Sequence, residues 1–211
     1  MNIECMVVGE FEVNCWIVWS ARREAAVIDP GADWQRIRDF LVAKDLTVAS
    51  YLLTHGHMDH VSALADLAEA LPAPVGIHAA DLAWAFSDEN QWAPYYPVPR
   101  RPSQIQPLDD GQVWTADDMR FHVIATPGHT PGSVCLLCEE SRALFSGDTL
   151  FAGSIGRTDF PGSSSRAMKQ SLKRLATLDD DIAVYPGHGP KTTIGAEKRS
   201  NFFMRAPPPV G

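Results

Sequence analysis

Four side chains that commonly bind metal ions stand together directly after an apolar run, and this feature limits the possible folds most strongly. The run VASYLLT covers residues 48–54 and is typical of a strand buried on both faces. His55, His57, Asp59 and His60 follow it at once. In an extended segment, residues two apart project to the same side, so the first two histidines are placed to hold one ion. If a helix begins just after them, the aspartate and the last histidine lie on its first turn, where a second ion is expected.

Three further candidate ligands also follow predicted strands. His129 comes after FHVIAT, Asp148 ends LFSGD, and His188 lies in VYPGHGP, each of them beside a glycine that lets the backbone approach a crowded site. Strand ends that meet at one edge are where α/β folds usually place their chemistry. The other two histidines, His78 and His122, stand beside no other ligand-type residue, and we assign both to structure.

The order of predicted elements indicates an α/β protein with two sheets packed face to face and helices outside. Short strands fill residues 1–28, a strand–helix alternation follows, and the same order returns in the second half of the chain. Apolar spacing predicts helices over residues 60–71 and 163–177. Residues 88–107 hold five prolines, which predicts an irregular loop.

Taken together, these motifs resemble the metallo-β-lactamase fold superfamily, whose H-x-H-x-D-H motif stands here as HGHMDH. The resemblance covers nearly the whole chain and implies a four-layer αββα sandwich that forms a single metallo-hydrolase domain over residues 1–205. It implies two divalent ions, with zinc expected and iron or manganese as alternatives. It also implies the ligand sets: His55, His57 and His129 for the first ion, Asp59, His60 and His188 for the second, and Asp148 as the bridge.

A site with two such ions favours a hydrolytic reaction. Two divalent ions lower the pKa of a shared water toward neutrality and so supply a bridging hydroxide as the nucleophile. Asp59 is the expected catalytic side chain, because it lies within reach of that water and is suited to orient it or to accept its proton.

A finer resemblance concerns the substrate. GSIGRTDFPG, residues 153–162, and PGHGPKTTIGAEKRSNFF, residues 186–203, look like the single-domain bacterial branch of glyoxalase II-like proteins. That likeness implies hydrolysis of a glutathione thioester such as S-lactoylglutathione. The longer glyoxalase II enzymes add a C-terminal helical domain, which is not expected here, and they carry Lys and Tyr where this loop has Arg157 and Asp159. Arg157 is therefore expected either to bind a substrate carboxylate or to pair with Asp159.

The main alternative belongs to another reaction class. Persulfide dioxygenases share this fold and a similar GRTDF loop but use a single iron, for which this chain offers His55, His129 and Asp148. Those enzymes typically differ around the last histidine, where this chain has PGHGP, so hydrolysis is favoured. A lactonase or another metallo-hydrolase is a further alternative. A non-enzymatic relative is disfavoured, because such relatives tend to lose ligands and this chain keeps all seven.

The composition of the chain argues against several classes of binding partner. The net charge is −8 and the 18 basic residues are scattered, which argues against nucleic acid. No apolar run reaches the roughly 18 residues that a membrane span requires. The N-terminus lacks a basic segment followed by a cleavage site. We therefore predict a cytoplasmic protein that acts on a small molecule.

Several remaining features are assigned to structure. Cys135 and Cys138 lie three apart on a predicted strand, so they point to opposite faces and are expected in the core rather than in a zinc or redox site. Trp92, Tyr95 and Tyr96 are expected to fix the loop over 88–107 to the core, with a wall of the substrate entrance as the alternative. The tail over 206–211 is expected to be frayed.

Overall fold

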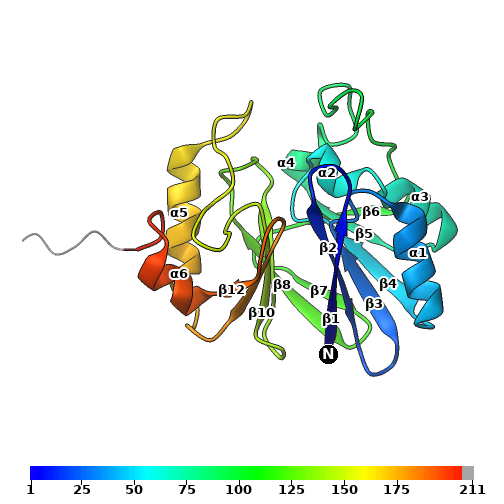
Figure 1. Ribbon diagram of the computed structural model, residues 1–211, viewed down its shortest axis with the longest axis horizontal. Coiled ribbons are helices and arrows are strands. Elements are labelled where there is room, and N and C mark those ends of the chain that lie inside the picture. The colour runs from blue at the N-terminus through cyan, green and yellow to red at the C-terminus, as the bar shows by residue number, and fades with distance from the viewer. Residues whose placement is uncertain (206–211) are drawn as a thin grey trace, which may run out of the picture.

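Two six-stranded sheets pack face to face, and helices cover the outer face of each, so that the chain forms four layers (Figure 1). This computed structural model describes residues 1–205, and the tail predicted to be frayed, 206–211, lies outside the described residues. The predicted αββα sandwich is confirmed. No helix within residues 1–205 combines the length and the apolar character needed to cross a membrane.

The first sheet contains the first half of the strands in chain order. Its strands are β1 (Asn2–Val8), β2 (Val13–Trp19), β3 (Glu24–Ile28), β4 (Thr47–Leu52), β5 (Val75–His78) and β6 (Ile105–Leu108). The first three run antiparallel, and β3 to β6 run parallel. Parallel neighbours need a crossover, which α1 supplies between β3 and β4 and which α2 and α3 supply between β4 and β5. The helices on this side are α1 (Trp34–Ala43), α2 (Met58–Val61), α3 (Leu64–Ala70) and α4 (Ala79–Leu82).

The second sheet contains the remaining strands in the same sequential manner. Its strands are β7 (Val113–Ala116), β8 (Met119–Ala125), β9 (Val134–Cys138), β10 (Ala143–Gly147), β11 (Ala183–Pro186) and β12 (Thr192–Thr193). Only β10 and β11 run parallel, and the helix between them, α5 (Ser165–Leu175), covers the outer face together with α6 (Ile194–Ser200) (Figure 1). The Ser164 hydroxyl caps α5 by accepting a hydrogen bond from the backbone N–H of Ala167.

Alternating side chains divide the core into three apolar layers. On β2, Trp16 faces the other sheet, whereas Ile17 faces the helices. On β9, Cys138 lies between the sheets and Cys135 lies toward α5, and both are buried. The two cysteines therefore point to opposite faces of their strand, and the prediction that both belong to the core is confirmed.

The single helix predicted over 60–71 is wrong, because the structure has two short helices with a break between them. At the break, the backbone N–H of Ala63 donates to the carbonyl of Pro30 at 3.1 Å, outside the helix. Gly31 lies so close to α2 that an added Cβ would overlap the carbonyl oxygen of Asp59. The turn after β3 thus holds α2 in place and prevents a continuous helix.

The predicted loop over 88–107 ends earlier than expected, because β6 begins at Ile105. This strand includes Pro107, which the edge of a sheet tolerates since no donor is needed on the open side. Within the loop, Tyr96 is buried against Phe11, with ring centroids 5.1 Å apart. Trp92 is 54% exposed even though its ring also contacts Phe11. Fixing the loop to the core therefore depends chiefly on Tyr96.

Candidate metal centre

All seven predicted ligands lie in segments that directly follow a strand, and the structure brings these segments together. The segment after β4 comes from the first sheet, and the segments after β8, β10 and β11 come from the second (Figure 1). Hydrogen bonds join the two sheets at this edge: Val134 N–H donates to the Thr54 carbonyl at 2.8 Å, and Asn14 N–H donates to the Gly187 carbonyl at 2.7 Å. The site therefore lies where the ends of the two sheets meet.

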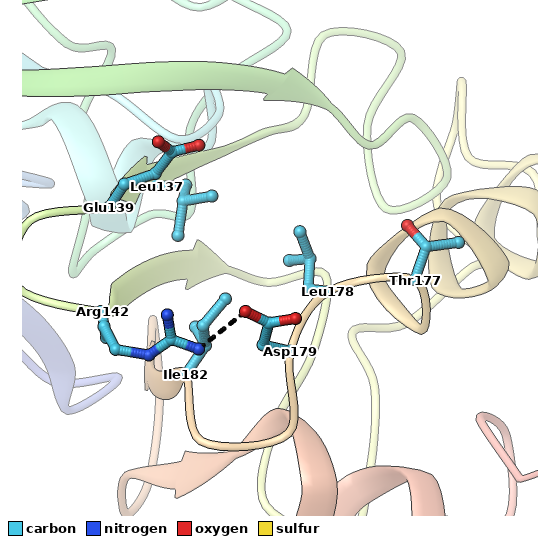
Figure 2. A pocket seen from close by; sticks show the side chains of 7 residues that line it. All are labelled: Leu137, Glu139, Arg142, Thr177, Leu178, Asp179 and Ile182. Carbon is cyan, nitrogen blue, oxygen red and sulfur yellow. Dashed lines mark hydrogen bonds and ion pairs between the residues drawn. The ribbon is translucent and has the colours of Figure 1, made fainter.

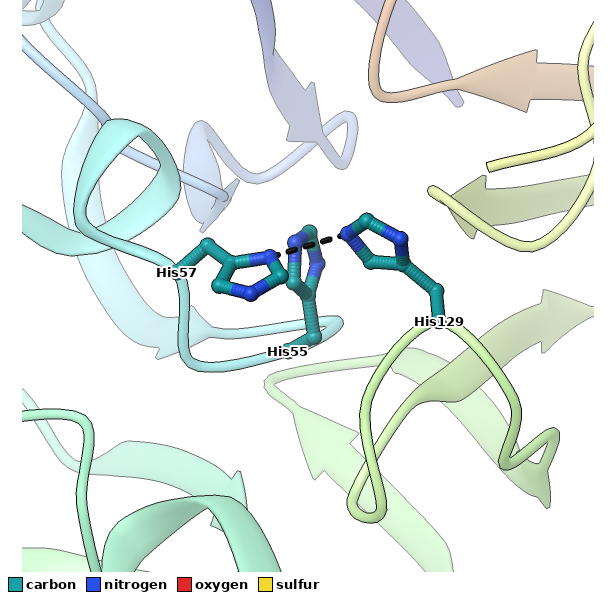
Figure 3. Close-up of side chains that lie close together, drawn as sticks. All are labelled: His55, His57 and His129. Carbon is teal, nitrogen blue, oxygen red and sulfur yellow. Dashed lines mark hydrogen bonds between the residues drawn. The ribbon is translucent and has the colours of Figure 1, made fainter. Parts of the chain in front are cut away.

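The first group, called here the three-histidine cluster, consists of His55, His57 and His129. One ring nitrogen from each lies within 4.8 Å of the other two. His57 Nδ1 is 2.9 Å from His129 Nε2, and the three rings point toward one another from two separate loops (Figure 3). Three converging imidazoles form a common ligand set for zinc and for other transition metals.

The second group, the aspartate cluster, consists of Asp59, His60 and His188. Their possible ligand atoms also lie within 4.8 Å of one another. Asp59 Oδ2 is 3.7 Å from His60 Nε2 and 3.6 Å from His188 Nε2. This cluster therefore offers a carboxylate together with two imidazoles.

Asp148 lies between the two clusters. Its Oδ2 is 3.5 Å from His129 Nε2 and 3.7 Å from His188 Nε2, and its Oδ1 is 3.5 Å from His60 Nε2. A single carboxylate thus faces ring nitrogens of both clusters.

Hydrogen bonds on the outer side of the rings fix which nitrogen is free. The Thr54 hydroxyl donates to Asp29 Oδ2 at 2.6 Å, so Thr54 Oγ1 accepts from His55 Nδ1 at 3.1 Å. His60 Nδ1 donates to Asp29 Oδ2 at 3.1 Å. His129 Nδ1 donates to the carbonyl of Arg157 at 2.8 Å. In each ring Nε2 is left facing the site, as outer partners commonly arrange around metals.

Several ligand atoms that face the centre of the site lack hydrogen-bond partners within residues 1–205, as expected of atoms that bind a metal ion. His55 Nε2, His60 Nε2 and Asp148 Oδ1 are buried and have no hydrogen-bond partner among the described residues. Buried polar atoms are rarely left unpaired in folded proteins. The chain therefore presents clusters of His and Asp that suit metal ions, and the donor set does not distinguish zinc from iron.

The two clusters differ in electrostatics. Burial and the neighbouring histidines lower the pKa of His55, and burial together with His129 lowers the pKa of His57 to about 3. Burial acts in the same direction on His60, but the carboxylates of Asp59 and Asp148 outweigh it and raise the pKa of His60 to about 10. Burial thus favours the neutral form of His55 and His57, whereas the carboxylates of the aspartate cluster attract positive charge.

In the same cluster, the pKa of Asp59 is lowered and the pKa of His188 is raised, so each shift favours the charged form. Burial would raise the pKa of Asp59, but the charges of His60 and His188 lower it to about 2. Burial would lower the pKa of His188, but the hydrogen bond to Asp59 and the charge of Asp148 raise it.

Arg157 is paired with a neighbour in this structure. Its Nε and Nη2 donate to the two carboxylate oxygens of Asp159 at 2.9 and 2.8 Å, and its guanidinium lies 4.3 Å from the centre of the Phe160 ring. Both side chains of the ion pair are 66% exposed. The structure therefore contains the predicted pairing, while a contact between Arg157 and substrate stays a prediction.

His78 and His122 lie outside both clusters. His78 Nδ1 accepts from Ala80 N–H at the start of α4, and His122 lies 3.9 Å from Glu139 on the second sheet. Both contacts agree with the structural role predicted for these two histidines.

Three residues that bear on the site were missed by the sequence analysis. Asp29 follows β3 directly and precedes Pro-Gly, so the rule that found Asp148 and His188 would also have found it. Asp81 and Asn90 bind the backbone beside His57, and Asp81 also binds the backbone N–H of Gly132 in the loop of His129. No local pattern marks either of them, because their partners are distant in sequence.

A surface hollow of about 350 Å³ lies elsewhere on the second sheet (Figure 2). Arg142 precedes β10 and Ile182 precedes β11, so this hollow is at the opposite strand ends from the candidate ligands. Arg142 already pairs with Asp179 and Asp181. The hollow therefore offers no uncommitted cation and is separate from the metal centre.

The fold and this site define a class of protein, and the comparisons agree with it: the chain belongs to the metallo-beta-lactamase superfamily, whose sequence profile matches residues 8–188. It is 36% identical over 211 residues to a hydroxyacylglutathione hydrolase, GloC, of Haemophilus influenzae, covering 98% of this chain and 99% of that protein.

Solved structures support the same superfamily assignment. The BLEG-1 B3 metallo-beta-lactamase superposes with a TM-score of 0.90 at 31% identity, over 97% of this chain and 100% of that one. TTHA1623 in a di-iron-bound form superposes with a TM-score of 0.86 at 38% identity, over 95% of this chain and 99% of that one.

Proposed function

We propose that this chain is a hydrolase with two divalent metal ions that cleaves a glutathione thioester such as S-lactoylglutathione. The observation that carries the proposal is the pair of ligand clusters joined at Asp148, whose carboxylate faces both. Similarity to GloC over nearly its full length supports the substrate class. The four cysteines are free thiols, which agrees with the cytoplasm as the proposed location.

The proposed ligand sets follow the two clusters. The three-histidine cluster would hold one ion and the aspartate cluster would hold the other, and Asp148, which faces both, would be a ligand to each. When bound, such a pair of ions polarises the acyl carbonyl and lowers the pKa of a water held between them.

Asp59 has the further role of orienting the attacking water. Its pKa is lowered to about 2, so it is an anion at neutral pH and accepts a hydrogen bond rather than keeping a proton. Because α2 sets its backbone and the aspartate cluster surrounds its side chain, this acceptor is held in one place.

Arg157 is the proposed contact for a substrate carboxylate. An exposed ion pair is weak, so a carboxylate of glutathione competes readily with Asp159 for the guanidinium. Phe160 lies beneath that guanidinium and also contacts the rings of His57 and His129, which connects this loop to the metal centre.

The experiment is thioester loss from S-lactoylglutathione by the purified chain, loaded separately with zinc, manganese or iron. Turnover that disappears with a chelator and returns with metal is the expected result. The matched control is Asp148→Ala, which removes the shared carboxylate. Absence of turnover with every metal would reject the thioesterase proposal.

The same preparations distinguish the alternatives. Oxygen uptake on glutathione persulfide by the iron-loaded chain, without thioester cleavage, would indicate a dioxygenase that uses His55, His129 and Asp148. Hydrolysis of a β-lactam without thioester cleavage would indicate an activity like that in the name of the BLEG-1 relative.

A further inference from the structure

Asp81 is a buried carboxylate that lies outside both ligand clusters. It is on α4, is 0% exposed, and accepts three hydrogen bonds. Its Oδ2 accepts from Gly56 N–H at 2.8 Å and from the Thr130 hydroxyl at 2.6 Å, and its Oδ1 accepts from Gly132 N–H at 2.7 Å. Every donor belongs to a loop that carries a candidate ligand.

The positions of these donors are specific. Gly56 separates His55 from His57, and Thr130 directly follows His129. One oxygen of Asp81 therefore joins two loops at residues adjacent to His57 and His129, which are 72 positions apart in the chain.

Glycines allow this close approach. An added Cβ at Gly132 would lie 2.7 Å from atoms of Asp81, and one at Gly56 would lie 3.1 Å from the Asp81 Cβ. The carboxylate is thus enclosed by backbone that has no room for side chains.

Asn90 holds the next peptide, which joins Gly56 to His57. Its Nδ2 donates to the Gly56 carbonyl at 2.8 Å, and its Oδ1 accepts from Met58 N–H at 3.0 Å. Asp81 and Asn90 therefore fix the two peptides on either side of Gly56, and the orientation of His57 depends on both.

We propose that Asp81 is a positioning residue for the three-histidine cluster: by joining the loops of His57 and His129, it sets the distance between their ring nitrogens. It does not serve the aspartate cluster, where His60 is held by Asp29 instead. This inference rests on the proposed function, because it assumes that the clusters hold metal ions.

The test is metal titration of the metal-free chain with zinc in competition with a chromophoric chelator. Dissociation constants are assigned to the clusters with His129→Ala and His188→Ala. Loss of an outer partner typically weakens metal binding by about 10- to 100-fold. We expect Asp81→Asn to weaken zinc binding at the three-histidine cluster by that factor. The zinc affinity of the aspartate cluster should stay within about threefold of the wild-type value.

Glu197→Gln is the matched control. Glu197 is also a buried carboxylate, 2% exposed, and accepts three hydrogen bonds, from Gly153 N–H, the Thr192 hydroxyl and Asn201 Nδ2. The substitution Glu197→Gln makes the same carboxylate-to-amide change on α6, so we expect it to lower the unfolding midpoint by a comparable amount. Both metal affinities are expected to stay within about threefold of those of the wild-type chain.

A second variant covers the case in which Asp81→Asn fails to fold, which circular dichroism detects. Thr130→Val keeps Asp81 and removes one of its three donors. This variant is expected to weaken zinc binding at the three-histidine cluster alone, by about three- to tenfold.

Three outcomes would overturn the positioning role: unchanged affinities in the folded variant, equal weakening of both clusters, or the same pattern in Glu197→Gln. A wild-type chain that binds no metal would overturn the proposed function as well. A wild-type chain that binds two ions, with variants that bind identically, would overturn the role of Asp81 alone.

Discussion

The three-histidine cluster and the aspartate cluster share one carboxylate, Asp148, yet they are built in different ways. In the first, burial lowers the pKa of His55 and lowers the pKa of His57 to about 3. In the second, the carboxylates outweigh burial and raise the pKa of His60 to about 10. His57 therefore binds a cation without releasing a proton, whereas His60 must release one, and the second cluster attracts cations through the charge of its carboxylates.

The two clusters also differ in what holds them. Asp81 and Asn90 fix the loop that carries His57, and Asp81 also fixes the loop of His129. Asp29 holds His60 directly and reaches His55 through Thr54. The difference teaches that Asp81 serves one cluster, whereas Asp29 connects both.

Removing the shared carboxylate should have the largest effect. Asp148→Ala takes a ligand from both clusters, so we expect kcat on S-lactoylglutathione to fall by about a thousandfold or more. Steady-state kinetics and metal content by atomic emission measure the result. A variant that keeps two tightly bound ions and most of its turnover would show that the clusters do not share Asp148.

The pH dependence of metal affinity should separate the clusters. Each proton that an ion displaces makes binding about tenfold tighter per pH unit of increase. The aspartate cluster carries such a proton at neutral pH, because the pKa of His60 is raised to about 10. The pKa of His188 is raised in the same direction. The affinity of the aspartate cluster is therefore expected to rise at least about a hundredfold from about pH 6 to about pH 8.

The three-histidine cluster should respond less over the same interval. The pKa of His57 is lowered to about 3, so this ring has already lost its proton at about pH 6, and burial lowers the pKa of His55 in the same direction. Chelator competition at several pH values gives both slopes. Equal slopes would remove the electrostatic contrast between the clusters.

Asp29→Asn should affect both clusters. The amide replaces an oxygen that accepts from Thr54 and His60, so the orientation of His55 and His60 is lost together. We expect both metal affinities to weaken by about 10- to 100-fold. Zinc titration measures this, and an effect confined to one cluster would contradict the proposed link through Thr54.

Arg157→Ala should have the smallest effect. An exposed charge contact is weak, so KM for the thioester is expected to rise about fivefold with kcat nearly unchanged. Asp159→Ala is the matched control, because it frees the guanidinium, and it is expected to leave KM the same or lower it. A fall in kcat in Arg157→Ala would instead place this residue in the chemistry.

The convergence of the candidate ligands was predictable because each lies in a segment that follows a strand, and strand ends meet at one edge of an α/β fold. His55, Asp148 and His188 all follow that rule. The break between α2 and α3 was not predictable, since it depends on a bond from Ala63 to Pro30 that only the folded chain makes.

The proposed positioning residues were harder to find than the candidate ligands. Asp81 lies in a segment with an ordinary helical pattern, and its role appears only when Gly56 and Gly132 meet in space. The role of Arg157 was left open for a different reason. Its side chain is exposed, so packing does not choose between Asp159 and a substrate.

The central claim is that both clusters must hold an ion for thioester hydrolysis. The most direct measurement is zinc titration of the metal-free chain, with S-lactoylglutathione cleavage followed after each addition. The account predicts little turnover while only one cluster is filled and a plateau at two equivalents. Full turnover at one equivalent, or none at two, would contradict it.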